Sequence, residues 1–256
     1  MLVKLIQCKA LYLGLPKILG MNPAPETKSE NTTETPSASV QEYLEAILRL
    51  LNKKEGYVKT GELAKYLGVV PASVTDKVKK NLTKKNYVVW KKGKGFKLTN
   101  KGRKIALDVL RRHRIAERLL VDLLGVSWEE AHDMACEWEH VLTEEQCNRV
   151  LEKLDDPATC PHGNPIPSAN GTLHPLPELS LADLDQGEEV TIDCISDENL
   201  EILRMMASMG MLPGERVRVI QVSPIGDTLL IEVGTAQFAL SCDLAGRIRV
   251  RRDEEE

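Results

Sequence analysis

The sequence predicts a mainly α-helical protein with a smaller β portion: an N-terminal winged helix-turn-helix, a helical middle domain and a small C-terminal antiparallel β-barrel. Three observations predict this class. Apolar residues recur at helical spacing between residues 40 and 154. Two short apolar runs near residue 90 have the pattern of a hairpin, and short strand-like runs dominate after residue 187. A chain of 256 residues is long enough for about two domains.

The charges are divided unevenly along the chain. Residues 53–114 hold 19 lysines and arginines against four acids, whereas residues 180–252 hold seven arginines and no lysine against 12 acids. A basic block followed by an acidic one predicts contact with nucleic acid in the first half only. A lysine-rich face that is merely solvated is the alternative, and an excess this large argues against it.

The six cysteines are scattered without a CxxC pair, which predicts free thiols in a reducing cytoplasm rather than a disulfide framework. No stretch approaches 18 uninterrupted apolar residues, so no membrane span is expected. The first 20 residues lack the continuous apolar core and the cleavage site of a signal peptide. Together with the polar segment that follows them, they predict a disordered N-terminal extension over residues 1–39.

Two short helices joined by a tight turn are expected between residues 60 and 82. The first ends at Gly68, which suits a left-handed helix C-terminus, and the second begins at Pro71, whose missing N–H costs nothing at a first helical position. This is a helix-turn-helix pattern. An earlier helix is expected to start at Val40, with Ser39 as its N-cap.

A β-hairpin wing is expected after the helix-turn-helix, with strands at 87–90 and 95–98 and a lysine-rich tip. Small and hydroxyl-bearing residues at the start of the second helix permit close approach to base edges, and lysines suit phosphates. The residues predicted to contact DNA are Pro71, Ala72, Ser73, Thr75, Asp76, Lys79, Lys80, Lys91, Lys92 and Lys94. The alternative is a winged helix that binds another protein.

The middle of the chain predicts three helices, at residues 101–124, 128–142 and 144–154. Their expected N-caps are Asn100, Ser127 and Thr143. Three of the five histidines of the chain lie in the first two of these helices.

Metal-competent side chains repeat at helical spacing in those two helices. His113 and Glu117 are four residues apart, so they point to one helix face. The next helix carries four more such residues, again three or four apart. Four residues overshoot one helical turn by about 40°, so this line of ligands winds around the helix and divides between two sites. The expected sites are His113, Glu117 and His132, and Cys136, Glu139 and His140 with help from elsewhere.

Imidazole, thiolate and carboxylate together suit Fe(II), Co(II), Ni(II) or Zn(II), and suit Mn(II) less well. Each residue alone is more simply a polar group on a helix surface, or a buried cysteine, but six at this spacing favour metal binding. A catalytic metal is not expected, because the chain has no HExxH motif and no obvious general base beside an open site. The chain is therefore predicted not to be an enzyme and to have no small organic substrate.

Three motifs resemble the diphtheria toxin repressor family of iron- and manganese-dependent regulators: HRIAERLL from His113, HDMACEWEH from His132 and PHGNPIP from Pro161. The resemblance covers residues 40–167, and residues 203–250 resemble the SH3-like domain of the ferrous-iron-transport A protein family. It implies a winged helix-turn-helix at 40–99, a helical metal-binding and dimerisation domain at 100–167, a linker at 168–184 and an SH3-like β-barrel at 185–253.

The resemblance also implies two ligand sets. Its ancillary site is His113, Glu117 and His132, the same set that the spacing indicates. Its primary site is Cys136, Glu139 and His140 plus one residue of the first helix. The third domain of the family adds further candidate ligands, here Asp197, Glu198 and Glu201.

The first-helix ligand bears on the choice of metal. The family alignment through Tyr43 and Leu44 places Glu42 at this position, where iron-type members have Met and manganese-type members have Asp. Glu45 also matches a manganese-type ligand. Cys136 is typical of the iron type, since manganese-type members carry a carboxylate there. The resemblance therefore implies a hybrid primary site.

The resemblance implies a cytoplasmic transcriptional regulator, expected to be a repressor of metal-homeostasis genes. It would bind a palindromic operator in double-stranded DNA as a homodimer when loaded with a divalent metal. Fe(II) is the first expectation for this metal and Mn(II) the second, and Zn(II), Co(II) or Ni(II) could take the same place in vitro. The alternative is a metal-binding enzyme or metallochaperone with an incidental winged helix. A third reading is a helix-turn-helix activator that needs no metal.

Overall fold

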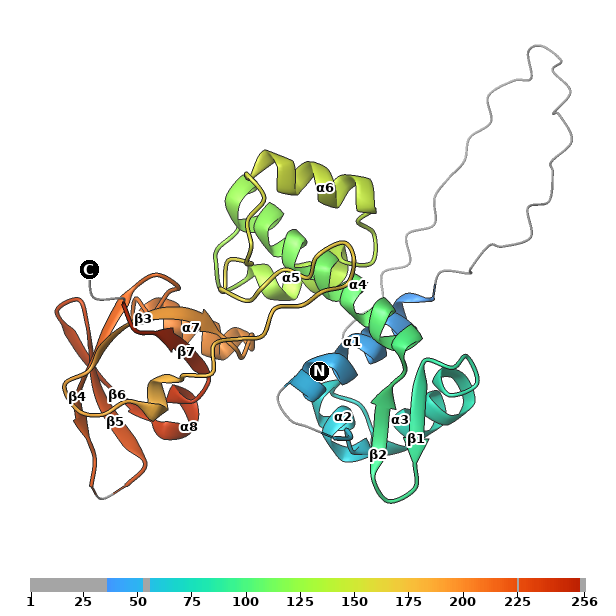
Figure 1. Ribbon diagram of the computed structural model, residues 1–256, viewed down its shortest axis with the longest axis horizontal. Coiled ribbons are helices and arrows are strands. Elements are labelled where there is room, and N and C mark those ends of the chain that lie inside the picture. Colours follow the sequence, from blue (N-terminus) through green and yellow to red (C-terminus); the bar gives the residue numbers. More distant parts are fainter. Residues whose placement is uncertain (1–35, 53–55, 225, 254–256) are drawn as a thin grey trace, which may run out of the picture. The chain divides into compact units, whose positions relative to one another are not determined.

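The computed structural model describes residues 36–52, 56–224 and 226–253, so most of the expected N-terminal extension lies outside the described residues. In chain order, Figure 1 shows three helices with a hairpin, a group of helices, and a β-rich region. The fold class predicted from the sequence is confirmed. Among the described residues, no helix is both long and apolar enough to cross a membrane.

The winged helix consists of three helices and a two-stranded hairpin. α1 (Ala38–Asn52) buries an apolar stripe that includes Leu44, Ile47 and Leu48. Gly68 has φ +64° in the turn after the second helix, as the helix-turn-helix pattern requires. The remaining elements are α2 (Thr60–Tyr66), α3 (Pro71–Lys77), its π-helical continuation η1 (Val78–Leu82), β1 (Val88–Lys91) and β2 (Gly95–Leu98), the two strands being antiparallel.

α1 starts earlier than predicted. Ser39 was expected to cap the helix, but it lies inside α1, where its hydroxyl accepts a hydrogen bond from Lys77 Nζ (3.0 Å). The carbonyl of Ser37 instead accepts hydrogen bonds from the backbone N–H groups of Val40 and Gln41. The predicted N-cap is therefore wrong, because a backbone group upstream supplies the first acceptor.

The helical region is formed by α4 (Asn100–Arg118), its π-helical end η2 (Leu119–Leu123), α5 (Ala131–Trp138) and α6 (Glu144–Lys153). Thr99, not Asn100, caps α4, because its hydroxyl accepts a hydrogen bond from the N–H of Gly102 (3.0 Å). Ser127 does not cap α5, which is shorter than predicted. The predicted cap Thr143 is confirmed, and forms a capping box with Gln146 at the start of α6.

The C-terminal region is an antiparallel five-stranded sheet of order β6-β5-β4-β3-β7. Its core includes Ile192, Ile195, Leu203 and Met206, all fully buried. The elements are η3 (Leu181–Asp183), β3 (Glu189–Ile195), α7 (Leu200–Ser208), β4 (Arg216–Val222), β5 (Thr228–Val233), β6 (Ala236–Ser241), α8 (Cys242–Ala245) and β7 (Ile248–Arg251).

Residues 160–164 join the helical region to the end of β3. The N–H of Ile195 donates to the carbonyl of His162 (3.0 Å), and Asn164 Nδ2 donates to the carbonyl of Ile195 (3.0 Å). Gly163 lies between them with φ +84°, and a Cβ there would lie 2.1 Å from the Asp193 carbonyl oxygen. Only glycine allows this approach. The junction places the residues that follow β3 beside α4.

Candidate metal centre and nucleic-acid interface

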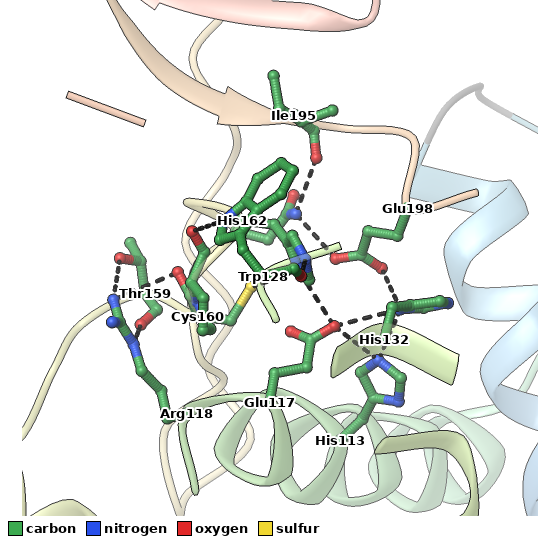
Figure 2. A network of polar contacts seen from close by, with 12 residues as sticks. His113, Glu117, Arg118, Trp128, His132, Thr159, Cys160, His162, Ile195 and Glu198 are labelled. Carbon is green, nitrogen blue, oxygen red and sulfur yellow. Dashed lines mark hydrogen bonds and ion pairs between the residues drawn. The ribbon is translucent and has the colours of Figure 1, made fainter. Parts of the chain in front are cut away.

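Glu117 on α4 lies at the centre of a buried polar network (Figure 2). Its Oε1 is 3.0 Å from His113 Nε2, 3.2 Å from His132 Nδ1 and 3.3 Å from His162 Nδ1. Glu117, His113 and His162 are completely buried. The second oxygen of Glu117, Oε2, is buried and has no hydrogen-bond partner among the described residues. A buried carboxylate oxygen without a partner is costly unless a cation binds it.

Metal-competent side chains gather around this network in four overlapping groups among the described residues. Within each group, one ligand atom per residue lies within 4.8 Å of the others. We name them the His132 group (His113, Glu117, His132, Glu198), the His162 group (Glu117, Cys160, His162, Glu198), the Cys136 group (His113, His132, Cys136) and the Glu45 group (Glu45, His113, Glu139).

The structure brings the predicted ancillary set together in the His132 group and adds Glu198 from the SH3-like region. Glu198 is buried, its Oε1 accepts a hydrogen bond from Asn164 Nδ2 (2.8 Å), and its Oε2 is 3.5 Å from His132 Nδ1. The other two candidates from this region lie outside the four groups. Asp197 pairs with Arg247 (2.6 Å) instead, and Glu201 is exposed on α7.

The predicted primary set is not assembled around one point. Glu139 is buried in the Glu45 group, where its Oε2 is 2.6 Å from His113 Nδ1. Cys136 belongs instead to the group that contains His113 and His132. His140 is in none of the four groups, although its Nε2 is 3.3 Å from Glu139 Oε1.

The first helix turns Glu45, rather than Glu42, toward these residues. Glu45 is buried and shares a group with His113 and Glu139, whereas Glu42 is exposed and belongs to none of the four groups. Three residues along a helix correspond to a rotation of about 300°, so the two side chains lie on adjacent parts of the surface, and packing decides which one is buried.

Cys160 and His162 are the site residues that sequence reasoning missed. The motif that contains His162 carried part of the family resemblance, but neither residue was assigned a metal role. Both lie in an irregular segment after α6, so no helical periodicity connects them with Glu117. A cysteine two residues before one of only five histidines was the available signal.

The histidines of the network compensate the buried acids. Burial by itself lowers the pKa of His132, but hydrogen bonds with Cys136 and Glu117 raise it to about 9. Burial opposes protonation of His113 and His162 too, and the Glu117 charge holds the pKa of both well above its usual range. In the metal-free protein these rings therefore hold protons that a metal ion would release.

The pKa values of Cys136 and Glu139 are shifted in opposite directions, the first toward the form that binds metals and the second away from it. Burial raises the pKa of Cys136, but hydrogen bonds from His113 and His132 outweigh it and lower the pKa to about 6. Cys136 is therefore a thiolate at neutral pH, the form that binds metals. Burial raises the pKa of Glu139 to about 8, against the hydrogen bond from His113. Glu139 therefore holds a proton until a cation replaces it.

Nitrogen, sulfur and oxygen donors of this mixture fit a borderline divalent transition metal. The unpartnered Oε2 of Glu117 is the observation of the structure that fits such an ion most directly. Asn164 orients Glu198, and the backbone carbonyl of Trp128 lies 2.9 Å from His162 Nε2, so hydrogen bonds from outside the groups hold two of the ligands in place.

The predicted DNA-contacting residues form the outer face of α3 with η1 and the tip of the β1–β2 wing. All of them are exposed except Thr75, which is half-buried and whose hydroxyl donates to the carbonyl of Pro71 (3.1 Å). Lys79 Nζ in η1 lies 4.3 Å from the ring centroid of Trp90 in β1, so a cation–π contact joins η1 to the wing.

Comparison with known proteins decides the family. The iron-dependent repressor IdeR of Mycobacterium leprae is 34% identical over 175 residues, which cover 61% of this chain and 73% of that protein. The chain belongs to the iron-dependent repressor family. The diphtheria toxin repressor of Corynebacterium glutamicum is 33% identical over 171 residues, 63% of this chain and 74% of that protein.

Three domain families match successive parts of the chain. The iron dependent repressor N-terminal DNA binding domain matches residues 36–96, the iron dependent repressor metal binding and dimerisation domain matches 99–168, and the FeoA domain matches 179–252. A solved manganese-dependent transcriptional repressor in complex with manganese has a TM-score of 0.75 at 32% identity, covering 82% of this chain and 98% of its own. This is a family of repressors, not of enzymes. The comparison therefore supports a metal-dependent transcriptional regulator over a metal-binding enzyme or metallochaperone.

Proposed function

We propose that this iron-dependent repressor homologue binds a palindromic operator as a homodimer when loaded with Fe(II), with Mn(II) next, and controls metal-homeostasis genes in the cytoplasm. One observation carries the proposal. The four ligand groups draw Glu45 from the DNA-binding region, His113, Glu117 and His132 from the helical region, and Glu198 from the SH3-like region. The candidate metal ligands therefore come from all three parts of the chain.

The ligands proposed for the ancillary site are His113, Glu117, His132 and Glu198, and the His162 group offers an adjoining site. For the primary site we propose Cys136, Glu139 and His140 with a carboxylate of α1. Burial beside Glu139 favours Glu45 as that carboxylate, while Glu42 remains the choice of the family alignment. When bound, a divalent ion supplies the positive charge that these carboxylates, thiolate and imidazoles jointly favour.

The position of Glu45 supports a route from metal binding to α3. Glu45 belongs to α1, whose apolar side chains form the core of the winged helix with residues such as Leu63 of α2 and Val74 of α3. His113 and Glu139 lie in the helical region. Shared ligation by Glu45, His113 and Glu139 would fix α1 against α4 and the end of α5, and so fix α3, which favours the DNA-competent arrangement over others. Two protomers fixed in this way present two reading helices to the halves of a palindrome.

The choice of Fe(II) ahead of Mn(II) rests on donor chemistry. The Cys136 thiolate and three imidazoles suit Fe(II), while a site of carboxylates alone would suit Mn(II). The same donors are expected to accept Zn(II), Co(II) and Ni(II) in vitro. The carboxylates Glu45, Glu117 and Glu198 make Mn(II) the next candidate.

Exposed apolar side chains in the helical region support the homodimer. Leu123 and Leu124 at the end of η2 are 41% and 56% exposed, Met134 on α5 is 38% exposed, and Val141 is 72% exposed. All four lie within residues 99–168, which match the metal binding and dimerisation domain of iron dependent repressors.

The test is operator binding measured anaerobically by electrophoretic shift, with DNA selected by the full-length protein from a random-sequence pool. Fe(II), Mn(II), Zn(II), Co(II) and Ni(II) are titrated separately. We expect a shift that requires metal and disappears with a chelator, and that is lost in Glu139→Ala and His140→Ala. A Lys153→Gln variant, changed on the exposed face of α6, serves as control. A shift that persists in the chelator would support the metal-independent activator, and metal binding without any shift would support the enzyme or metallochaperone.

A further inference from the structure

Arg49, in the last turn of α1, reaches the candidate metal centre from the DNA-binding region. Its Nε donates to Glu45 Oε1 (2.9 Å), and its Nη1 donates to Glu198 Oε2. All three side chains are largely buried, with exposed fractions of 13% for Arg49, 8% for Glu45 and 6% for Glu198. One guanidinium thus bridges a carboxylate of the winged helix and a carboxylate of the SH3-like region.

Both partners of Arg49 are members of ligand groups. Glu198 belongs to the His132 and His162 groups, and Glu45 to the Glu45 group. Asn164 holds Oε1 of Glu198, so Oε2, the oxygen on the His132 side, is the one that Arg49 occupies. The guanidinium therefore binds the oxygen that Glu198 would offer to an ion in the His132 group.

The guanidinium differs from the other cations of this network. Protons on the histidines leave as the rings become ligands, but a guanidinium is not deprotonated in proteins, so it gives up a carboxylate only by moving. A divalent ion and a guanidinium on the same buried carboxylate repel each other, and each reduces the negative charge available to the other. Burial raises the pKa of Glu198, and Arg49 outweighs burial and lowers it to about 2, so the two groups interact strongly in the metal-free protein.

We propose that Arg49 is a tethered competitor for the metal: it neutralises Glu45 and Glu198 in the metal-free protein, raises the metal concentration needed for binding, and releases α1 from the SH3-like region when the ion recruits these carboxylates. The inference rests on the proposed function. Arg49 is in this view a positioning residue that sets the metal threshold, and not a ligand.

Competition with the metal and a purely structural ion pair predict opposite effects of removing Arg49 on metal affinity. If Arg49 only held the two regions together, its removal would disorder Glu198 and weaken metal binding. If Arg49 competes with the ion, Arg49→Gln binds metal more tightly, by about tenfold, within the usual range of coupling between two sites. Arg49→Gln would at the same time lower the stability of the metal-free protein, because two buried carboxylates lose their partner.

The experiment measures Mn(II) dissociation constants of the full-length protein by competition with a fluorescent chelator, for the wild type, Arg49→Gln and Arg49→Lys. Arg247→Gln is the matched control, because it removes a guanidinium that pairs with Asp197 and Asp243 and contacts no member of the four groups. We expect tighter binding in Arg49→Gln, an intermediate value in Arg49→Lys, which keeps the charge but not the two-pronged contact, and no change in the control.

A double variant separates the proposed cause from a general charge effect. In a Glu198→Gln background the gain from Arg49→Gln should shrink, because the contested carboxylate is already absent. Unchanged or weaker Mn(II) binding in Arg49→Gln overturns the competitor role while the proposed function stands. A wild-type protein that binds no Mn(II) or Fe(II) overturns both. If Arg49→Gln does not fold, as judged by circular dichroism, Arg49→Lys decides, and tighter binding than wild type is then required.

Discussion

Replacing Gly163 by alanine tests whether the junction between the helical and SH3-like regions positions the metal ligands. Gly163 has φ +84°, and a Cβ added there would lie 2.1 Å from the carbonyl oxygen of Asp193 and 2.6 Å from Cys194 Cβ. Its neighbours Asn164 and His162 hydrogen-bond with Ile195, three residues before Glu198. Alanine at this position must therefore push the end of β3, and Glu198 with it, away from α4.

Two costs contribute to the effect on stability. Holding a non-glycine residue at positive φ costs about 1–2 kcal/mol. Relieving the two close contacts requires backbone shifts like those of an overpacked core, which adds about 1–3 kcal/mol. The expected loss for Gly163→Ala is therefore about 2–5 kcal/mol in the free energy of unfolding.

Gly171 provides a matched control. It has nearly the same backbone angle, φ +82°, but the nearest atom to an added Cβ is Leu107 Cδ1 at 3.9 Å. Gly171→Ala should therefore lose only the first cost, about 1–2 kcal/mol.

Urea unfolding of the metal-free proteins measures both losses, and Mn(II) titration measures the consequence for the site. We expect Gly163→Ala to bind Mn(II) at least about tenfold more weakly than Gly171→Ala, because Glu198 is withdrawn. Equal losses of stability in the two variants would refute the steric argument, and an unchanged Mn(II) affinity in Gly163→Ala would refute the role of the junction.

Three further predictions concern the carboxylates and the wing. Glu45→Gln should weaken Mn(II) binding by at least about tenfold while Glu42→Gln leaves it within about twofold, measured by chelator competition; the reverse order would favour the family alignment over the packing seen here. The pKa of Glu198 is lowered from 4.5 to about 2, so its ion pair stabilises the metal-free fold above pH 4.5. This contribution, at most about 3 kcal/mol, is lost as the pH falls toward 2. Urea unfolding across this range should show the loss of stability, and Glu198→Gln should remove this pH dependence. Lys92→Gln should weaken operator binding and reduce the slope of log affinity against log salt by about 1, whereas an unchanged slope would place Lys92 off the DNA.

Local patterns carried much of the fold. Gly68 and Pro71 mark the turn and the start of α3 because their backbone requirements are independent of the rest of the chain. The N-cap at Thr143 was likewise predicted from the local sequence and is confirmed. The N-caps predicted at Ser39, Asn100 and Ser127 failed, because an upstream carbonyl, a neighbouring threonine and a turn provided the first acceptors instead.

The sequence by itself determined that His113 and Glu117 share a helix face, that His132 lies within reach on the next helix, and that the chain resembles metal-dependent repressors. These facts follow from the helical period and from motifs within short segments. Only the tertiary structure decided that Glu198, from another part of the chain, joins them. It also decided that α1 buries Glu45 and exposes Glu42, and that Cys160 and His162 complete an adjoining group.

The physical reason for this difference is that helical periodicity acts over a few residues, whereas tertiary packing joins segments far apart in the chain. A helical period fixes the direction of side chains a few residues apart, whatever the helix packs against. Which far-off segments meet depends on how whole elements pack, on a glycine such as Gly163 that lets two backbones approach, and on a buried charge such as Arg49 that must find its partners. None of these features has a period along the chain. The sequence alone therefore could not show that the candidate metal ligands come from three separate regions.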